Sequence, residues 1–259
     1  MTAPLLTATN LQKRFDSRGR AVAALDDVSF EVAPGETLAL VGPSGSGKTT
    51  AARALMRLTE LDGGEIRFDG EDLLALGGGR LRATRARLQM VFQDPRAAFN
   101  PRATVARVLD DPLRIHGIAP RRERPEAIAQ LLQRVALSPD LANRAIHEIS
   151  GGQRQRVAIA RAIATRPQLI VLDEAVSALD VSVRGQILQL LLDLQRSQNI
   201  AYLFISHDLG VVRAIAHRVA IMDKGRIVET GRAAEVIADP QSLTAQALVA
   251  AAPKLRHRA

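Results

Sequence analysis

The chain has 259 residues and a formal net charge of +8, a length that allows one large domain or two intimate subdomains. It contains no Cys, which excludes disulfides, thiolate metal sites and iron–sulfur clusters bound by its own thiolates. Its basic residues are scattered apart from two local runs, and one Tyr and no Trp leave few aromatic platforms for stacking bases. Direct nucleic-acid binding is therefore not expected. The two basic runs are Arg121-Arg122-Glu123-Arg124 and the tail Lys254-Leu255-Arg256-His257-Arg258.

No apolar run approaches the roughly 20 residues that cross a bilayer. The N-terminus, Met1-Thr2-Ala3-Pro4-Leu5, lacks the basic region and long apolar core of a signal peptide. We therefore expect a cytosolic chain, unless another subunit holds it at a membrane.

The first third of the chain predicts strands joined by turns. Residues 28–32 alternate apolar Val28, Phe30 and Val32 with polar residues, the pattern of a half-buried strand. After a Pro-Gly turn, residues 37–41 are almost uniformly apolar, which suits a strand buried on both faces of a parallel sheet. Residues 66–68, between two turn signals, predict a further short strand.

The middle of the chain predicts helices. From residue 104 to residue 166 apolar residues recur at helical spacing, and Pro120, Pro125 and Pro139 divide this region into short helices. The Gly77-Gly78-Gly79 tract before it predicts a surface loop. Strand and helix then alternate, with strands at 169–172 and 201–205 and an amphipathic helix at 183–196. The pattern indicates an α/β core with antiparallel strands at the front and an inserted helical region.

A phosphate-binding pattern, G-x-x-x-x-G-K-S/T, is formed by Gly42-Pro43-Ser44-Gly45-Ser46-Gly47-Lys48-Thr49. Glycines let backbone N–H groups wrap phosphates, Lys48 reaches the outer phosphates, and Thr49 offers a hydroxyl to Mg²⁺. The alternative is a Gly-rich turn followed by an unrelated lysine. The pattern lies between a predicted strand and a predicted helix, as phosphate binding requires, and this favours the functional interpretation.

Two carboxylates follow an apolar strand in Leu169-Ile170-Val171-Leu172-Asp173-Glu174. Asp173 would hold the Mg²⁺ shell, and Glu174 would orient and deprotonate an attacking water. Two acids that merely cap a buried strand are the common alternative. The phosphate-binding pattern on the same chain favours the catalytic interpretation.

A third motif, Ser150-Gly151-Gly152-Gln153, precedes a predicted helix. Ser150 is a plausible N-cap, and the glycines let the start of the helix approach an anion closely. Alone this motif is weak. Because it lies shortly before the Asp–Glu strand, it is the feature of the sequence that best distinguishes between classes of phosphate-loop protein.

Together these motifs resemble the ATP-binding cassette (ABC) ATPases, and the resemblance covers nearly the whole chain. In that family the S-G-G-Q loop binds the γ-phosphate of ATP held by a second subunit, so that two chains sandwich two nucleotides head to tail. The resemblance implies that residues 150–153 act on a partner's ATP. It also implies a P-loop NTPase fold, an ABC ATPase domain over residues 1–240 with a helical subdomain at about 100–166, and a short tail at 241–259.

Four further elements resemble family motifs. Gln93 matches the Q-loop that senses Mg²⁺ and links to membrane subunits, and Ser177-Ala178-Leu179-Asp180 matches the D-loop. His207 matches the switch histidine that contacts the γ-phosphate, and Phe15 matches the aromatic residue that stacks on adenine. For Phe15 a buried strand residue is the alternative. The histidines without such context, read as structural or exposed, are His116, His147, His217 and His257.

The resemblance implies ATP and Mg²⁺ as ligands. The implied nucleotide-binding residues are Phe15, Gly42, Pro43, Ser44, Gly45, Ser46, Gly47, Lys48, Thr49, Thr50, Gln93, Asp173, Ser150, Gly151, Gly152 and Gln153. The implied Mg²⁺ ligands are Thr49, Gln93 and Asp173, and the implied catalytic residues are Lys48, Glu174 and His207. No His, Asp and Glu cluster suggests a further metal site.

Within the family the chain resembles bacterial oligopeptide, dipeptide and nickel importers. The segments that carry this likeness are Phe92-Gln93-Asp94-Pro95, Asn100-Pro101-Arg102 and Leu172-Asp173-Glu174-Ala175-Val176-Ser177. Gln241-Ser242-Leu243-Thr244 departs from the common His-Pro-Tyr-Thr, and Ile149 stands where Leu is usual. The resemblance leaves peptides and nickel or other metal complexes open as the transported substrate.

Such importers place two ATPase chains, identical or different, beneath two transmembrane permeases that an external binding protein feeds. The resemblance thus implies a peripheral protein on the cytoplasmic face of the inner membrane. The alternative is a soluble ABC ATPase of DNA repair or iron–sulfur assembly. Repair and chromosome ATPases usually place a long coiled coil between their phosphate-binding loop and their signature motif. In this sequence the segment between Lys48 and Ser150 has no sustained heptads.

Overall fold

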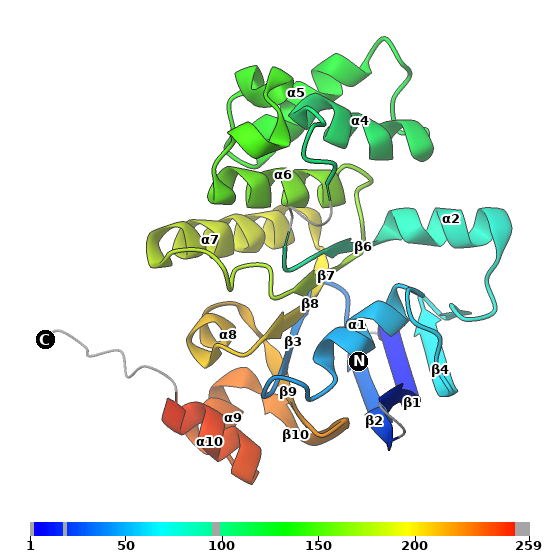
Figure 1. Ribbon diagram of the computed structural model, residues 1–259, viewed down its shortest axis with the longest axis vertical. Coiled ribbons are helices and arrows are strands. Elements are labelled where there is room, and N and C mark those ends of the chain that lie inside the picture. Colours follow the sequence, from blue (N-terminus) through cyan, green and yellow to red (C-terminus); the bar gives the residue numbers. More distant parts are fainter. Residues whose placement is uncertain (1–2, 18–19, 95–98, 252–259) are drawn as a thin grey trace, which may run out of the picture. The chain divides into compact units, whose positions relative to one another are not determined.

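The structure, a computed structural model, describes residues 3–17, 20–94 and 99–251 (Figure 1). The chain forms two compact units, one made of Met1–Ala75 with Ala201–Ala259 and one of Leu76–Ile200. Pro95 and the basic tail at 254–258, both singled out in the sequence, lie outside the described residues. Among the described helices, none has the length and apolar character needed to cross a bilayer.

The first unit contains an antiparallel sheet in the order β2-β1-β4-β5. Its strands are β1 (Leu6–Ser17), β2 (Arg20–Val32), β4 (Gly63–Phe68) and β5 (Glu71–Asp72). The alternation predicted at residues 28–32 is confirmed, because Val28 and Val32 are buried whereas Ser29 and Glu31 are exposed. The short strand predicted at 66–68 is the end of β4.

The same unit contains a second set of strands in the order β10-β9-β3-β8. β3 (Thr37–Val41) runs parallel to both β8 (Ala201–Ser206) and β9 (Arg218–Asp223), and β10 (Arg226–Arg232) is antiparallel to β9. Every residue of β3 and β8 is buried, as the uniformly apolar pattern predicts. β3 and β8 are therefore buried along their whole length, and exposed residues occur in the loops that follow them.

The described part of this unit contains the helices α1 (Lys48–Leu55), α8 (Leu209–Ile215), α9 (Ala233–Ala238) and α10 (Leu243–Ala251). A core cluster joins α8, α9 and α10 to the strands, with Val41 and Ile221 meeting Leu209, Val212 and Val236. Burying a side chain of this size contributes about 1.5–3 kcal/mol. The cluster thus fixes the ends of β3 and β9 against their covering helices.

The second unit begins with α2 (Gly78–Arg87), which leads into β6 (Leu88–Val91), and β6 pairs in parallel with β7 (Leu169–Asp173). The surface loop predicted at Gly77–Gly79 is wrong at two positions, because Gly78 and Gly79 form the first turn of α2. Gly77 is the N-cap, its carbonyl accepts the Leu81 N–H at 3.3 Å, and the residues after it are good helix formers. All three glycines are exposed, as predicted.

Three helices pack together in this unit, namely α4 (Val105–Ile115), α5 (Arg124–Arg134) and α6 (Gly151–Ile163) (Figure 1). The apolar stripe of α4, from Val105 through Leu109 to Leu113, is buried at the spacing of one helix face. Two short 3-10 helices, Pro139–Asn143 and Ile146–Glu148, connect α5 to α6, and α7 (Val181–Gln198) lies beside α6. Of the predicted breaks, Pro125 is the second residue of α5, and Pro139 is the first residue of a 3-10 helix.

The contribution of the α4 N-cap to the stability of the protein can be tested by mutation. The Thr104 hydroxyl accepts the Arg107 N–H at 3.2 Å. Thr104→Ala should therefore lower the free energy of unfolding by about 1 kcal/mol, whereas Thr104→Ser should stay close to wild type because it keeps the acceptor. Urea denaturation of the three proteins measures the difference. An equal loss in both variants would show that the methyl group, and not the cap, matters.

Candidate functional site

The predicted phosphate-binding loop connects β3 to α1 in the first unit. Pro43, Ser44 and Gly45 form its exposed crest, Ser46 is buried, and Thr49 and Thr50 lie half-buried in the first turn of α1. Gly47 has φ +107°, and a Cβ there would lie 2.1 Å from the carbonyl oxygen of Ala24. No other residue fits this position, so the loop keeps a bare backbone where phosphate is expected.

Lys48 folds back over this loop. Its side chain is only 5% exposed, and its ammonium donates to the Gly42 and Pro43 carbonyls at 2.8 Å each and to the Ser46 hydroxyl at 3.1 Å. The N-cap of α1 is Gly47, which has no side chain to cover the helix start. A cation and an uncapped helix N-terminus around a bare-backbone loop fit a phosphate group.

His207 lies at the same edge of the sheet as this loop. Val41, the last residue of β3, pairs in register with Ser206, so the phosphate loop and His207 leave neighbouring parallel strands side by side. His207 is exposed, and the residues on both sides of it are fixed. The Asp208 N–H donates to the Ser206 hydroxyl at 3.0 Å, and the Asp208 carboxylate caps α8 through the Gly210 N–H at 2.8 Å.

Phe15 lies near the end of β1, paired with Val22 of β2. Its side chain is 44% exposed, so the alternative of a buried strand residue is wrong. The Lys13 ammonium lies 5.4 Å from the ring centroid and also binds Asp62 at 2.9 Å, which holds the pKa of Asp62 below its usual value. The ring is therefore held on one side by a cation–π contact and presents aromatic surface to solvent.

In the second unit, parallel pairing brings Gln93 to Glu174. Val91 of β6 is in register with Leu172 of β7, so the residues after these strands emerge together. The Gln93 amide donates to the Glu174 carboxylate at 2.9 Å. Asp173 ends β7 and is 4% exposed. The structure thus brings together the predicted Q-loop residue, Gln93, and the predicted base, Glu174.

Glu174 has a strained backbone, with φ +47° in the left-handed region. Such a conformation costs a non-glycine residue about 1–3 kcal/mol and is common at functional sites. Its carbonyl accepts two hydrogen bonds from Ser177, one from the hydroxyl at 2.9 Å and one from the N–H at 3.1 Å. The segment predicted as the D-loop therefore holds the predicted base in place.

The S-G-G-Q motif forms the start of α6, as predicted. The Ser150 hydroxyl accepts the Gln153 N–H at 3.2 Å, and the Gln153 side chain accepts the Ser150 N–H at 2.9 Å, which makes a capping box. A Cβ at Gly152 would lie 2.7 Å from Cγ1 of Val183, in the first turn of α7. The start of the signature helix is therefore packed directly on the start of α7.

Asp180 caps α7 and closes the D-loop. Its carboxylate accepts the Val183 N–H at 2.9 Å and the Ser182 hydroxyl at 2.8 Å, and these bonds lower the pKa of Asp180. The D-loop is thereby fixed at both ends, by Ser177 on Glu174 and by Asp180 on α7.

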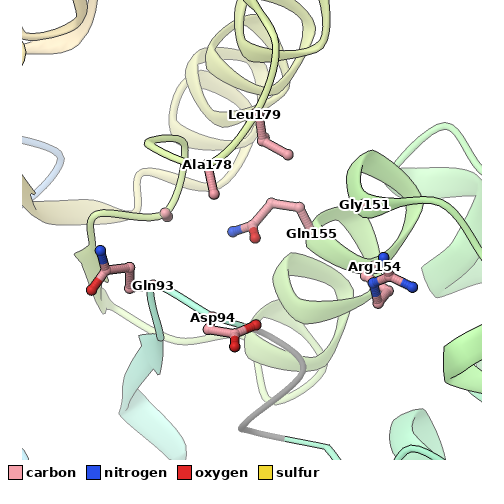
Figure 2. Close-up of a pocket in the computed structure, with 8 residues that line it drawn as sticks. Gln93, Asp94, Gly151, Arg154, Gln155, Ala178 and Leu179 are labelled. Atoms are coloured by element: carbon pink, nitrogen blue, oxygen red, sulfur yellow. The ribbon is translucent and has the colours of Figure 1, made fainter.

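A pocket of about 460 Å³ opens between these elements of the second unit (Figure 2). It is lined by Gln93, Asp94, Gly151, Arg154, Gln155, Ala175, Ala178 and Leu179. Gln155 points into it from α6 and was not singled out in the sequence. A signal was present: Gln155 lies one turn before Ala158 and Ile159 on a buried stripe, where a polar residue is unusual.

The predicted site residues are divided between the two units. The first unit holds Phe15, the phosphate loop and His207, and the second holds Gln93, Asp173, Glu174 and residues 150–153. Among the other histidines, His147 contacts the Pro101 carbonyl at 2.9 Å and His217 accepts the Thr37 N–H at 3.0 Å, as structural residues would, whereas burial lowers the pKa of His116. His257 lies outside the described residues. No cluster of metal-ligating side chains occurs in the described part of the chain.

Comparisons with known proteins show the family to which the chain belongs. Residues 25–177 match the family model described as ABC transporter. The chain is 52% identical over 257 residues to the glutathione import ATP-binding protein GsiA of Escherichia coli K12, covering 96% of this chain and 41% of that protein. The same protein of Shigella flexneri gives the same values. The chain therefore spans about two fifths of the length of the curated relatives it matches.

Two solved structures are similar in fold. The cassette MJ0796, in a dimeric post-hydrolysis state bound to ADP and Pi, superposes with a TM-score of 0.80 at 28% identity, covering 88% of this chain and 98% of that one. CbiO1 of Clostridium perfringens, part of the transporter complex cbiONQ, gives a TM-score of 0.79 at 26% identity and covers 91% of each chain.

The two glycines of the S-G-G-Q motif should differ in their tolerance of substitution. Gly152→Ala should lower the free energy of unfolding by about 1–3 kcal/mol because its Cβ overlaps Val183. Gly151→Ala should stay within about 1 kcal/mol of wild type, since its Cβ meets no atom within 4 Å. Chemical denaturation without nucleotide measures both. Val183→Ala should relieve most of the Gly152→Ala loss, and an undiminished loss in the double variant would contradict the steric explanation.

Proposed function

Because this chain belongs to the ABC transporter family and has the fold of its ATP-binding cassettes, we propose that it is the ATP-hydrolysing subunit of a bacterial importer of peptide-like substrates. The observation that carries the proposal is the alignment of nearly the whole chain with a glutathione import ATP-binding protein. That relative supports a peptide-like substrate over the nickel complexes that the sequence leaves open. A soluble ABC ATPase of DNA repair or iron–sulfur assembly is not favoured.

The phosphate loop supplies the binding energy for ATP. Its backbone N–H groups and the start of α1 bind the phosphates, and the Lys48 ammonium exchanges its loop acceptors for the outer phosphate oxygens. Phe15 stacks on adenine through its exposed ring surface. His207, fixed between Ser206 and Asp208, positions the γ-phosphate.

Glu174 is the base that orients and deprotonates the attacking water, and Gln93 holds its carboxylate through a hydrogen bond. Mg²⁺, when bound, neutralises charge on the phosphate oxygens, and Thr49, Gln93 and Asp173 offer the oxygen donors that this ion prefers. The capping box presents the start of α6, from Ser150, to the γ-phosphate of a partner chain's ATP.

In the transporter, two cassette chains close on two MgATP molecules beneath two permeases, and an external binding protein delivers the substrate. ATP binding across the two chains drives the permeases to switch, and hydrolysis resets them. The permeases hold the chain at the cytoplasmic face of the membrane.

Removal of the Lys48 ammonium tests the ATPase assignment. Lys48→Ala should lower ATP turnover at least about 100-fold, because it removes a charge that stabilises the transferring phosphoryl group. Steady-state phosphate release measures the loss. Arg53→Ala removes one exposed positive charge from the same helix and should leave turnover unchanged. Near-normal turnover in Lys48→Ala would refute the assignment of the phosphate loop.

Replacement of the base tests the transport assignment. Glu174→Gln should bind ATP, fail to hydrolyse it and accumulate as a closed dimer with MgATP, because it keeps the shape of the side chain without its basicity. Size-exclusion chromatography with MgATP detects the dimer, and the Lys48→Ala/Glu174→Gln double variant is the control that should stay monomeric.

The same trapped variant identifies the partners. Tagged Glu174→Gln protein, isolated from native membranes with MgATP, should bring down two multi-span permeases. Recovery of soluble proteins or nucleic acid alone would leave the ATPase chemistry intact and overturn the transporter assignment.

A further inference from the structure

Gln155 carries a buried amide that makes no hydrogen bond through its nitrogen. The residue is 2% exposed, and its Nε2 has no partner among the described residues. A side-chain amide nitrogen has two N–H donors, and an unmade bond at a buried donor costs free energy that folding must overcome elsewhere. Such groups are rare in native proteins, so this one requires an explanation.

The neighbouring side chains of similar polarity are, in contrast, satisfied. Arg154 donates to the Ile149 carbonyl at 2.6 Å and is buried. Gln195 is a buried glutamine on α7, and its amide donates to the Ile200 carbonyl at 3.1 Å. Of these two buried glutamines in the described part of the unit, Gln195 has its amide nitrogen satisfied and Gln155 does not.

The position of Gln155 indicates what it could bind. Figure 2 shows its amide directed into the pocket, between Gln93 on one side and Ala178 and Leu179 of the D-loop on the other. The Gln93 amide already donates to Glu174. Ala178 and Leu179 of the D-loop line this pocket, and a backbone carbonyl is the kind of acceptor that an unpartnered N–H requires.

We propose that Gln155 is a positioning residue that couples the signature helix α6 to the D-loop, and that its amide donates to a D-loop carbonyl only in the ATP-bound, closed form. The inference rests on the proposed ATPase function and adds a step to it. ATP at the start of α6 shifts this helix toward the D-loop and completes the missing bond. The D-loop then transmits the shift to Glu174, whose carbonyl Ser177 already holds.

In this arrangement the Gln155 donor is unsatisfied in the resting form and satisfied in the closed form. The hydrogen bond therefore lowers the free energy of the closed form relative to the resting form, and it does not change the affinity of the phosphate loop for ATP. Gln155 should therefore act on the rate of hydrolysis and on closure of the dimer, and not on the affinity for ATP.

The test compares Gln155→Met with Gln195→Met, which makes the same change at a satisfied amide. Gln155→Met should raise the melting temperature of the nucleotide-free protein, because it removes an unpartnered donor. It should also lower kcat for ATP about tenfold with KM for ATP unchanged, the effect of one hydrogen bond made only in the closed form. In the Glu174→Gln background it should weaken the MgATP-dependent dimer by a similar factor.

Gln195→Met should instead lower the melting temperature and leave kcat unchanged, because it removes an existing hydrogen bond at a residue that does not line the pocket. A melting temperature that falls in Gln155→Met as it does in Gln195→Met would show that the Gln155 amide is satisfied at rest and would overturn the proposal. An unchanged kcat, or a raised KM with unchanged kcat, would overturn it equally.

These failures are distinct from failure of the proposed function. If wild-type protein hydrolyses ATP in a manner that depends on Lys48 while Gln155→Met keeps full kcat, only the coupling role is wrong. If wild-type protein shows no Lys48-dependent turnover, the ATPase function itself is wrong.

Discussion

The candidate site depends on the register of parallel strands that are buried on both faces. Val41 pairs with Ser206 in one unit and Val91 with Leu172 in the other, so the loops that contain the predicted site residues leave the strands in matched pairs. In a strand with one solvated face, a slip by one residue exposes the core and is strongly disfavoured. β3 and β8 lack that protection, because all their residues are buried. Their register must be set elsewhere.

Hydrogen bonds at the strand entrances fix this register. The Tyr202 N–H donates to the Glu36 carbonyl at 2.7 Å where β3 and β8 begin, and the Gln168 N–H donates to the Arg87 carbonyl at 2.8 Å before β6 and β7. Since the strands are only four to six residues long, an alignment fixed at the entrance is carried to the exit with little error. The placement of Gln93 against Glu174 thus follows from the Gln168–Arg87 contact at the opposite end of β6 and β7.

Much of this arrangement could be predicted from the sequence, and the family and fold class are confirmed. Local sequence patterns correctly predict the buried strands at 37–41 and 169–172 and the helix N-cap at Ser150. The loop predicted at Gly78 failed because helix-forming residues after it outweigh two glycines in a first turn. The contact of Gly152 with Val183 and the unmet donor of Gln155 could not be predicted, since both depend on residues brought together only by folding.

Two energetically unfavourable features lie close to the D-loop. Glu174 adopts a left-handed backbone, and Gln155 buries an amide nitrogen without a partner. A sequence that folds well usually avoids such conflicts, and their presence together points to selection for something other than stability. The D-loop connects them physically, because Ser177 holds Glu174 and the next two residues line the pocket that Gln155 enters. Ser177 and Asp180 anchor the two ends of this segment, so a displacement of the segment toward Gln155 would also pull on the carbonyl of Glu174. In the proposed coupling, the hydrogen bond that satisfies Gln155 in the closed form therefore acts on the residue proposed to activate water.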